Sequence, residues 1–194
     1  SGRASAIIVR AISSTERSSI MNIVYIERST GDKRDGDWAE ELKLEGAERI
    51  VVGMGPGSFA GVRSALAFAQ GYAIATGWEV VGIPSACALA GEGKIAVVGD
   101  ARRGLRWVAL FDGMKSAKEI FQVEAERLEG AIPGEYRVKT VDEKRIGEEL
   151  KGKFGARYLG GEAPTAEGLR RYAEANPSAL VKEPLPIYLN PAVR

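Results

Sequence analysis

The sequence predicts an α/β protein with two lobes, each built on a mixed β-sheet. Residues 51–77 combine an apolar β-branched run, a glycine-rich turn and an alanine-rich stretch, which is the order of a strand–turn–helix unit. Short apolar runs recur on both sides of this unit. A chain of 194 residues, 45% of them hydrophobic, can bury one or two cores. We therefore expect residues 1–100 to form an N-terminal lobe with the loop and a central helix, and residues 101–194 a smaller C-terminal α/β lobe.

The first part of the chain predicts a β-hairpin. Residues 6–11 and 20–26 are apolar runs typical of strands, and the polar residues 13–19 between them suit a turn. Further on, residues 38–44 fit a short helix. The central strand follows over residues 50–52, where a β-branched run is typical of a strand covered on both faces.

A loop then leads into the longest predicted helix. Its glycines allow positive φ and Pro56 fixes φ, so regular structure stops here. Ser58 is a natural N-cap for a helix that runs to Thr76, and Gly77 is a natural terminator. We expect Gly55 or Gly57 to adopt a positive φ or to lie too close to other backbone to admit a Cβ.

The long helix carries no charge between Arg63 and Glu79, which predicts that it is buried on more than one side. The stripe expected to face the sheet consists of Val62, Leu66, Ala69 and Ala73. The opposite stripe, which we assign to a partner interface, consists of Ser64, Phe68, Gly71 and Ala75. Small residues let another helix approach closely, and Phe68 would be the anchor because large aromatic side chains dominate interface cores.

The remainder of the chain predicts short strands and helices in alternation. Strands are expected over residues 79–83, 94–98, 105–111, 119–124, 136–141 and 157–159, with 105–111 and 119–124 as antiparallel partners. Helices are expected over residues 84–90, 145–153 and 165–175, the last capped by Thr165. Residues 184–194 read as an extended tail punctuated by proline.

Composition excludes several classes of function. A net charge of +1 gives no overall positive charge that would favour direct binding to nucleic acid. No run of apolar residues is suited to cross a membrane. The chain has no histidine, which removes Ser-His-Asp and Cys-His catalysis and most transition-metal sites. Cys87 is the single cysteine, so no internal disulfide can form and a reducing cytoplasm is the expected location. We predict no catalytic residue and no metal site.

The glycine-rich loop has two interpretations from its residues alone. The first is a nucleotide-binding enzyme, because Gly55-x-Gly57-x-x-Ala60 formally fits a dinucleotide fingerprint at a helix N-terminus. Two residues argue against this interpretation. Pro56 lies inside the turn, and the acidic residue that the fingerprint has at the end of the next strand is here Glu79, at the start of that strand. The second is that the glycines only permit a tight turn and close helix packing.

A third interpretation comes from resemblance. Residues 55–63, GPGSFAGVR, resemble the GPGSFTG(L/V)R signature of the TsaB (YeaZ) family, with weaker matches in the family's order at residues 81–90, 100–111 and 186–189. Ala60 stands where the signature usually has threonine, and residues 8–13, matched to the family's "IDTS" turn, lack its aspartate. The signature positions in this chain are Gly55, Pro56, Gly57, Ser58, Phe59, Gly61 and Arg63.

The resemblance implies the actin/Hsp70/sugar-kinase (ASKHA) fold and a role in forming N6-threonylcarbamoyladenosine (t6A37) in tRNA. It implies a non-catalytic subunit that supports a related TsaD-type catalytic paralogue, whose family carries metal-binding histidines. It also implies no tightly bound cofactor, ATP only in the complex, and tRNA contacted only indirectly. A homodimer is the other assembly that the helix stripe could form.

Two further groups of residues are candidates for chemistry. Asp100 and Asp112 could form a metal or acid/base pair, although such residues more often close turns at strand ends. Arg102 and Arg103, with Arg106 nearby, form a basic cluster and are candidate phosphate contacts, although a solvated turn is the simpler interpretation.

Overall fold

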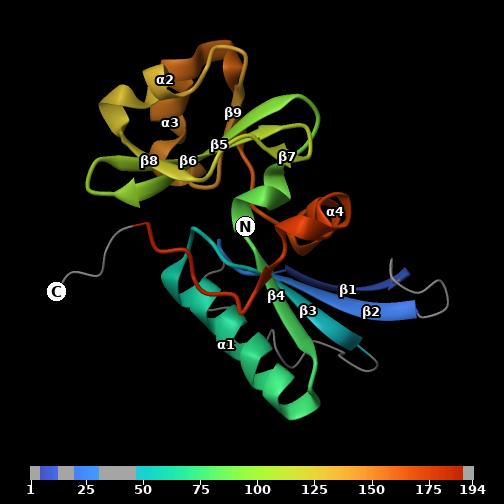
Figure 1. Cartoon of the computed structure of the whole chain (residues 1–194). Coiled ribbons are helices and arrows are strands. Elements are labelled where there is room, and N and C mark those ends of the chain that lie inside the picture. Colours follow the sequence, from blue (N-terminus) through green and yellow to red (C-terminus); the bar gives the residue numbers. More distant parts are fainter. Residues whose placement is uncertain (1–4, 13–19, 31–46, 190–194) are drawn as a thin grey trace. The chain divides into compact units, whose positions relative to one another are not determined.

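The computed structural model describes residues 5–12, 20–30 and 47–189 (Figure 1). The chain forms two compact units: Ser1–Ala88 with Pro164–Ile187, and Leu89–Ala163 with Tyr188–Arg194. This division differs from the expected boundary at residue 100. The strand that begins at Lys94 is central in the second unit's sheet, and the chain returns to the first sheet after Pro164.

The first unit contains a five-stranded sheet in the order β1-β2-β3-β4-β11. Strands β1 (Ser5–Ile12) and β2 (Ile20–Glu27) pair antiparallel along their whole length, which confirms the predicted hairpin. Strands β2, β3 (Ala47–Gly53) and β4 (Glu79–Ile83) are parallel, and β11 (Val181–Lys182) adds an antiparallel edge. The sheet is therefore mixed, as expected.

Helices cover both faces of this sheet (Figure 1). Helix α1 (Phe59–Thr76) packs on the face formed by Val24, Ile26, Ile50 and Val52. Tyr25 alternates to the other face, where α4 (Ala166–Ala175) lies. Burial there, with the charge of Glu174 on α4, raises the pKa of Tyr25 to about 12. Because successive side chains of β2 point to opposite faces of the sheet, this strand contacts α1 on one face and α4 on the other.

The ends of both helices follow the local signals in the sequence. Ser58 caps α1 by accepting a hydrogen bond from Gly61 N at 3.3 Å, and Gly77 ends it in the left-handed conformation at φ 76°. Thr165 caps α4 by accepting from Gly168 N at 3.0 Å. All three predictions are confirmed.

Helix α1 is buried on one side. Its buried residues are Gly61, Val62, Ala65, Leu66 and Ala69, and Ala73 is half-buried. Among the described residues, α1 is buried on the side that faces the sheet, and the burial of its other side by a partner stays a prediction. The expected helix over residues 38–44 lies outside the described residues.

The second unit has a mixed sheet in the order β10-β9-β5-β6-β7, with β8 also paired to β6. Its long antiparallel pair is β5 (Lys94–Arg102) and β6 (Leu105–Asp112). The shorter strands are β7 (Lys115–Ser116), β8 (Phe121–Glu124), β9 (Arg137–Thr140) and β10 (Tyr158–Gly161). The predicted antiparallel pairing of 105–111 with 119–124 is confirmed.

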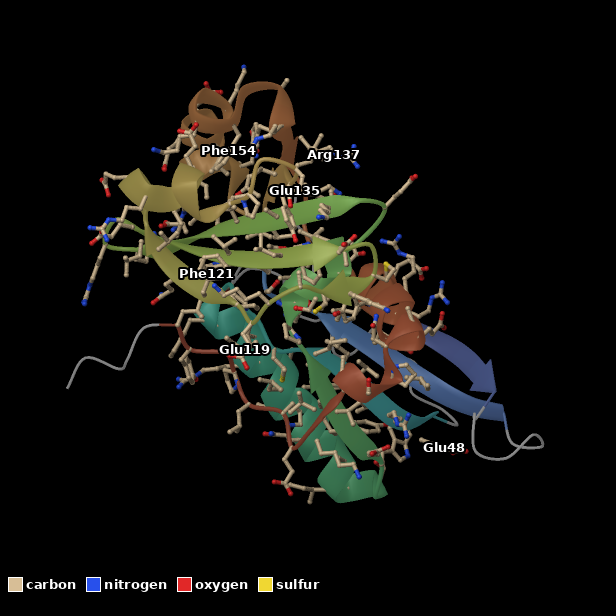
Figure 2. The ribbon with its side chains drawn as sticks, turned by 45° about the horizontal axis from the view of Figure 1, so that its top comes forward. Glu48, Glu119, Phe121, Glu135, Arg137 and Phe154 are labelled. Carbon is tan, nitrogen blue, oxygen red and sulfur yellow. The ribbon has the colours of Figure 1, made fainter. Side chains whose placement is uncertain are left out.

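Helices α2 (Leu128–Ala131) and α3 (Glu143–Phe154) close the core of this unit. Phe154 is buried there, and Phe121 packs against the same core (Figure 2). Short 3-10 turns complete the chain at Ser85–Leu89, Ala125–Arg127, Gly155–Arg157 and Pro177–Ala179. Among the described residues, no helix combines the length and the apolar character needed to cross a membrane.

Candidate functional site

The carboxyl ends of the parallel strands β2, β3 and β4 meet at one edge of the first sheet. Glu27 ends β2 and residues 28–29 follow it, Gly53 ends β3 and residues 54–58 follow it, and residues 84–85 follow β4. Ligands of α/β proteins bind outside the carboxyl ends of parallel strands. This edge, which includes the glycine-rich loop, is therefore the candidate site.

The loop is tied to the end of β4 by backbone geometry and one hydroxyl. Gly55 has φ +84°, which confirms that its conformation suits glycine, and the Gly55–Pro56 peptide is cis. Ser85 Oγ accepts a hydrogen bond from Gly55 N at 3.0 Å, and Ser85 N donates to Gly55 O at 2.8 Å. Met54 N donates to Ile83 O at 2.9 Å. The loop is thus a fixed extension of the sheet.

Three glycines make room for the segment that follows β2. A Cβ on Gly53 would lie 1.9 Å from Glu27 Oε2, and one on Gly57 would lie 2.4 Å from Ser29 O. A Cβ on Gly61 would lie 2.2 Å from the carbonyl oxygen of Arg28. The prediction that Gly57 leaves no room for a side chain is confirmed. The glycines of this stretch therefore serve close backbone packing.

Glu27 is an acid buried in that junction. The residue is 1% exposed, and its Oε1 accepts a hydrogen bond from Ser29 N at 2.5 Å. Burial raises the pKa of the Glu27 carboxyl above its ordinary value of 4.5, while hydrogen bonds from Ser29 and Ser85 oppose this effect.

The signature residues divide between an inner and an outer side. Ser58 faces inward, since its N–H donates to Ser29 O at 2.5 Å and its hydroxyl caps α1. Pro56 is buried. Phe59 and Arg63 face outward, and the Arg63 guanidinium stacks 3.9 Å above the Phe59 ring. Ser58 therefore serves as the cap of α1, and its own N–H and hydroxyl are both engaged within the chain.

The outer face of α1 carries most of the stripe assigned to a partner. Ser64, Gly71 and Ala75 are exposed. Phe68, however, is half-buried, packs against the core of this unit and lies 5.8 Å from the Tyr72 ring. The large apolar side chain on the outer face is Ile74, which is 88% exposed. Phe68 is therefore only partly available on the outer face, and its role as an interface anchor stays a prediction.

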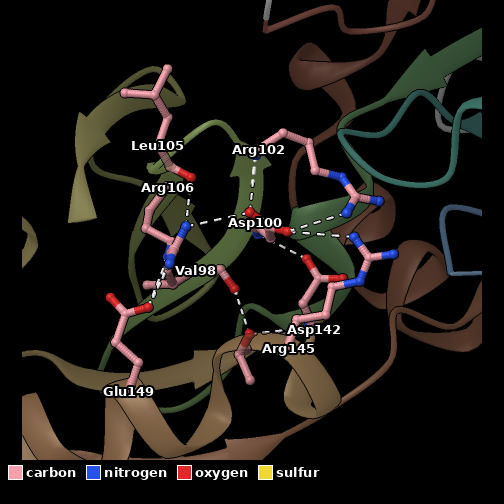
Figure 3. A network of polar contacts seen from close by, with 9 residues as sticks. Val98, Asp100, Arg102, Leu105, Arg106, Asp142, Arg145 and Glu149 are labelled. Carbon is pink, nitrogen blue, oxygen red and sulfur yellow. Dashed lines mark hydrogen bonds and ion pairs between the residues drawn. The ribbon is translucent and has the colours of Figure 1, made fainter.

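A polar network in the second unit contains three of the other candidates, Asp100, Arg102 and Arg106 (Figure 3). The Asp100 carboxylate is within 3.3 Å of Arg106, 3.4 Å of Arg145 and 3.7 Å of Arg102. Asp112 lies at the far end of the β5–β6 pair, opposite Lys94, so the structure does not bring the two aspartates together. No group of three Asp, Glu, His or Cys side chains suited to hold a metal occurs within the described ranges.

Sequence reasoning missed residues 27–29. Residues 8–13 resemble the turn that ends the family's first strand. In this structure those residues begin in β1, which is the edge strand of the sheet. The strand beside β3 is β2, so Glu27 takes the position next to the glycine-rich loop. The apolar run at residues 23–26, followed directly by Glu-Arg-Ser, was the available signal.

Comparison with known proteins identifies the family. A family model described as TsaD, tRNA N6-adenosine threonylcarbamoyltransferase, matches residues 39–135, which is half of the chain. The chain belongs to this family.

Solved structures agree with the fold of TsaB (YeaZ) proteins. The chain is similar to YeaZ from Pseudomonas aeruginosa, with 22% identity, a TM-score of 0.60 and coverage of 77% of this chain and 78% of that one. A second structure from the same organism, an uncharacterized protein with similarity to peptidase YeaZ, gives a TM-score of 0.61 at 22% identity, covering 78% of both chains. This likeness establishes the ASKHA-type fold. With the family match, it confirms the resemblance predicted from the loop signature.

Curated relatives match over a shorter segment. Uncharacterized proteins of Mycobacterium bovis and Mycobacterium tuberculosis are each 38% identical to this chain over 78 residues. The match covers 39% of this chain and 37% of each relative, so the shared part is well under half of either protein.

Adding a side chain at Gly57 tests the packing of the loop. We expect Gly57→Val to lower the free energy of unfolding by about 1–3 kcal/mol, because the new side chain meets the Ser29 backbone. Gly71→Ala is the matched control: nothing lies within 4 Å of its Cβ position, and alanine should stabilise the helix by about 0.5–1 kcal/mol. Urea denaturation measures both. An unchanged stability for Gly57→Val would contradict the packing.

The buried acid predicts a dependence of stability on pH. Because the folded state holds the Glu27 proton more tightly than the unfolded state, stability is present below pH 4.5 and is lost as the pH rises toward the folded-state pKa. Glu27→Gln removes this titration and keeps the side-chain size. The wild type should therefore lose stability relative to the variant as the pH rises above 4.5 in denaturant titrations. Parallel stability curves for the two proteins would show that Glu27 is not the titrating group.

Proposed function

We propose that this chain is an accessory subunit in the formation of N6-threonylcarbamoyladenosine in tRNA, where it supports a TsaD-type catalytic subunit. Family membership supports the reaction. The exposed face of α1, which carries no charged residue after Arg63, is the observation that supports the accessory role. The proposed place of action is the cytoplasm, which agrees with a single cysteine, Cys87, that is buried as a free thiol.

The chemistry at the strand ends supports a subunit that does not react with substrate itself. The inner side of the loop is occupied by residues 27–29, and Ser58 is engaged as a helix cap. Ser58 also has no imidazole to activate it, because these 194 residues contain no histidine. The loop then acts as a rigid support for α1, and a partner would provide the catalytic groups.

The outer face of α1 has the features of a helix–helix interface. Ser64, Ala67, Gly71 and Ala75 are small and exposed, which allows another helix to approach closely. Ile74 adds a large apolar side chain on the same face, and Phe59 is 61% exposed at the start of the helix. Exposed apolar patches of this kind mark association sites. We assign this face to the TsaD-type paralogue, and a homodimer is the competing outcome.

A charge on this face should prevent association without unfolding the chain. We expect Ile74→Asp to keep the melting temperature within a few degrees, because the side chain is 88% exposed, and to weaken binding to a TsaD-type subunit at least tenfold. Phe68→Asp is a poorer probe since Phe68 packs on the core. Isothermal calorimetry and size-exclusion chromatography measure the association.

Leu159→Asp is the matched control. Leu159 is an apolar residue of the second unit that is 44% exposed, and its substitution should leave association unchanged. Equal binding by Ile74→Asp and wild type would exclude the α1 face as the interface. If the substitution disrupts a homodimer but not the TsaD-type complex, the face belongs to self-association.

The competing function is a nucleotide-binding enzyme that uses the loop at residues 55–61. The exposure of Phe59 and Ala60 at the helix N-terminus is the observation that favours it. Titration of the purified chain with ATP and with NAD separates the two functions. We expect no binding of either nucleotide by the chain alone, and ATP binding only when the TsaD-type subunit is added. Tight binding by the chain alone would favour the enzyme.

A further inference from the structure

The turn between β5 and β6 has a backbone that suits glycine better than the residues it carries. Arg102, Arg103 and Gly104 have φ values of 67°, 52° and 76°, all in the left-handed region. Glycine enters this region freely, whereas arginine does so at a conformational cost. Two consecutive arginines here are therefore unfavourable for the turn itself. Strained residues of this kind are concentrated at sites where the side chain has a function.

The structure also holds the side chains near this turn in place (Figure 3). Arg102 and Arg145 both contact the same oxygen, Asp100 Oδ2, at 3.7 and 3.4 Å. Each uses only its Nη1 in the contacts that the described residues make, and their side chains remain 64% and 48% exposed. Their other guanidinium N–H groups can therefore reach a ligand from solvent.

Arg106 has a different role in the same network. Its Nη2 lies 2.5 Å from Glu149 Oε2, and its Nη1 donates to Leu105 O at 2.9 Å and contacts Asp100 Oδ1 at 3.3 Å. The side chain is only 12% exposed, so Arg106 is a structural support. Asp142 is turned toward the backbone, where its Oδ2 accepts from Asp100 N at 2.8 Å. The groups of this network that face solvent are therefore the guanidinium groups of Arg102 and Arg145.

The shape of this region suits an extended ligand. The turn ends the β5–β6 hairpin with three exposed residues, 102–104, and none of them lines the surface recess of about 480 Å³ at Glu129, Ile132 and Phe154. Exposed guanidinium donors fit successive phosphates on a large polyanion better than they fit an enclosed nucleotide.

We propose that Arg102 and Arg103 at the hairpin end, together with Arg145 of α3, bind phosphodiester groups of RNA. The choice of RNA rests on the proposed function in tRNA modification. The resemblance and the net charge of +1 predict only an indirect contact with tRNA, but exposed guanidinium groups of the hairpin end and of α3 can act locally. Backbone contacts of this kind position an RNA without reading its sequence.

The test measures direct binding of a fluorescent tRNA anticodon stem-loop to the full chain alone, by anisotropy over a range of KCl concentrations. The combined Arg102→Gln, Arg103→Gln and Arg145→Gln variant should bind roughly tenfold more weakly, and its slope of log affinity against log salt should be smaller by about two. The matched control removes three exposed lysines elsewhere in the unit, Lys115, Lys118 and Lys151, and should bind within about twofold of wild type.

A single substitution separates function from folding. Arg103→Gly should raise the melting temperature, because glycine suits the left-handed position, and should weaken RNA binding at the same time. The proposal is overturned if wild type does not bind the stem-loop, if the triple variant binds as well as wild type, or if the lysine control loses as much affinity. Inorganic phosphate or ATP that displaces the RNA at micromolar concentration would assign the turn to a small anion instead. Because no TsaD-type subunit is present in this assay, its outcome is independent of whether the α1 interface exists.

Discussion

The first unit depends on the close approach of three backbone segments at the carboxyl edge of its sheet. Gly53, Gly57 and Gly61 each lie where a Cβ would overlap residues 27–29. Hydrogen bonds from Ser58 N to Ser29 O and from Gly55 N to Ser85 Oγ can form only because that approach is possible. The direction of α1 is fixed by the same contacts, since the helix begins immediately after Ser58. One steric condition thereby determines where the outer face of the helix points.

A buried carboxyl at this junction is unusual, because burial disfavours the charged form of an acid. Glu27 is tolerated because Ser29 N donates to its Oε1 and because Gly53 leaves space for its Oε2. The glycine-rich loop and the acid are thus one packing arrangement contributed by neighbouring parallel strands. The loop needs no bound anion to explain its glycines, which is why a packing role for the signature explains this structure better than a phosphate-binding one.

Local signals in the sequence were sufficient for much of the fold. Ser58, Gly77 and Thr165 act through hydrogen bonds and φ values within a few residues, so their roles could be predicted without knowing the tertiary structure. The position of Glu27 could not be predicted in this way. It depends on whether β1 or β2 lies beside β3, and that choice is made by contacts between residues far apart in the chain.

Contacts between residues far apart in the chain also account for two other differences between the predicted and the observed structure. The helical period placed Phe68 on a stripe opposite Val62, but the rotation of α1 on the sheet buries Phe68 partly and leaves Ile74 exposed. The lobe boundary was placed at residue 100 from a change in pattern along the chain. The actual division depends on α4, whose sequence is amphipathic but does not say which sheet it covers.

The two turns of most interest show opposite relations between backbone and side chain. At residues 53–57 the backbone either packs closely against residues 27–29 or adopts a positive φ. Glycine is present at each position where a side chain would be excluded. At Arg102 and Arg103 the backbone also favours glycine, yet long cationic side chains occupy it. Packing explains the first turn completely. In the second, Arg106 contacts Asp100 Oδ1 and Glu149 Oε2 from beneath, whereas the exposed arginines keep N–H groups directed to solvent, and the proposed RNA contact would offset the conformational cost. The loop therefore supports the helix, whereas the hairpin end combines a backbone that favours glycine with exposed cationic side chains, which is the basis of the RNA contact that we propose there.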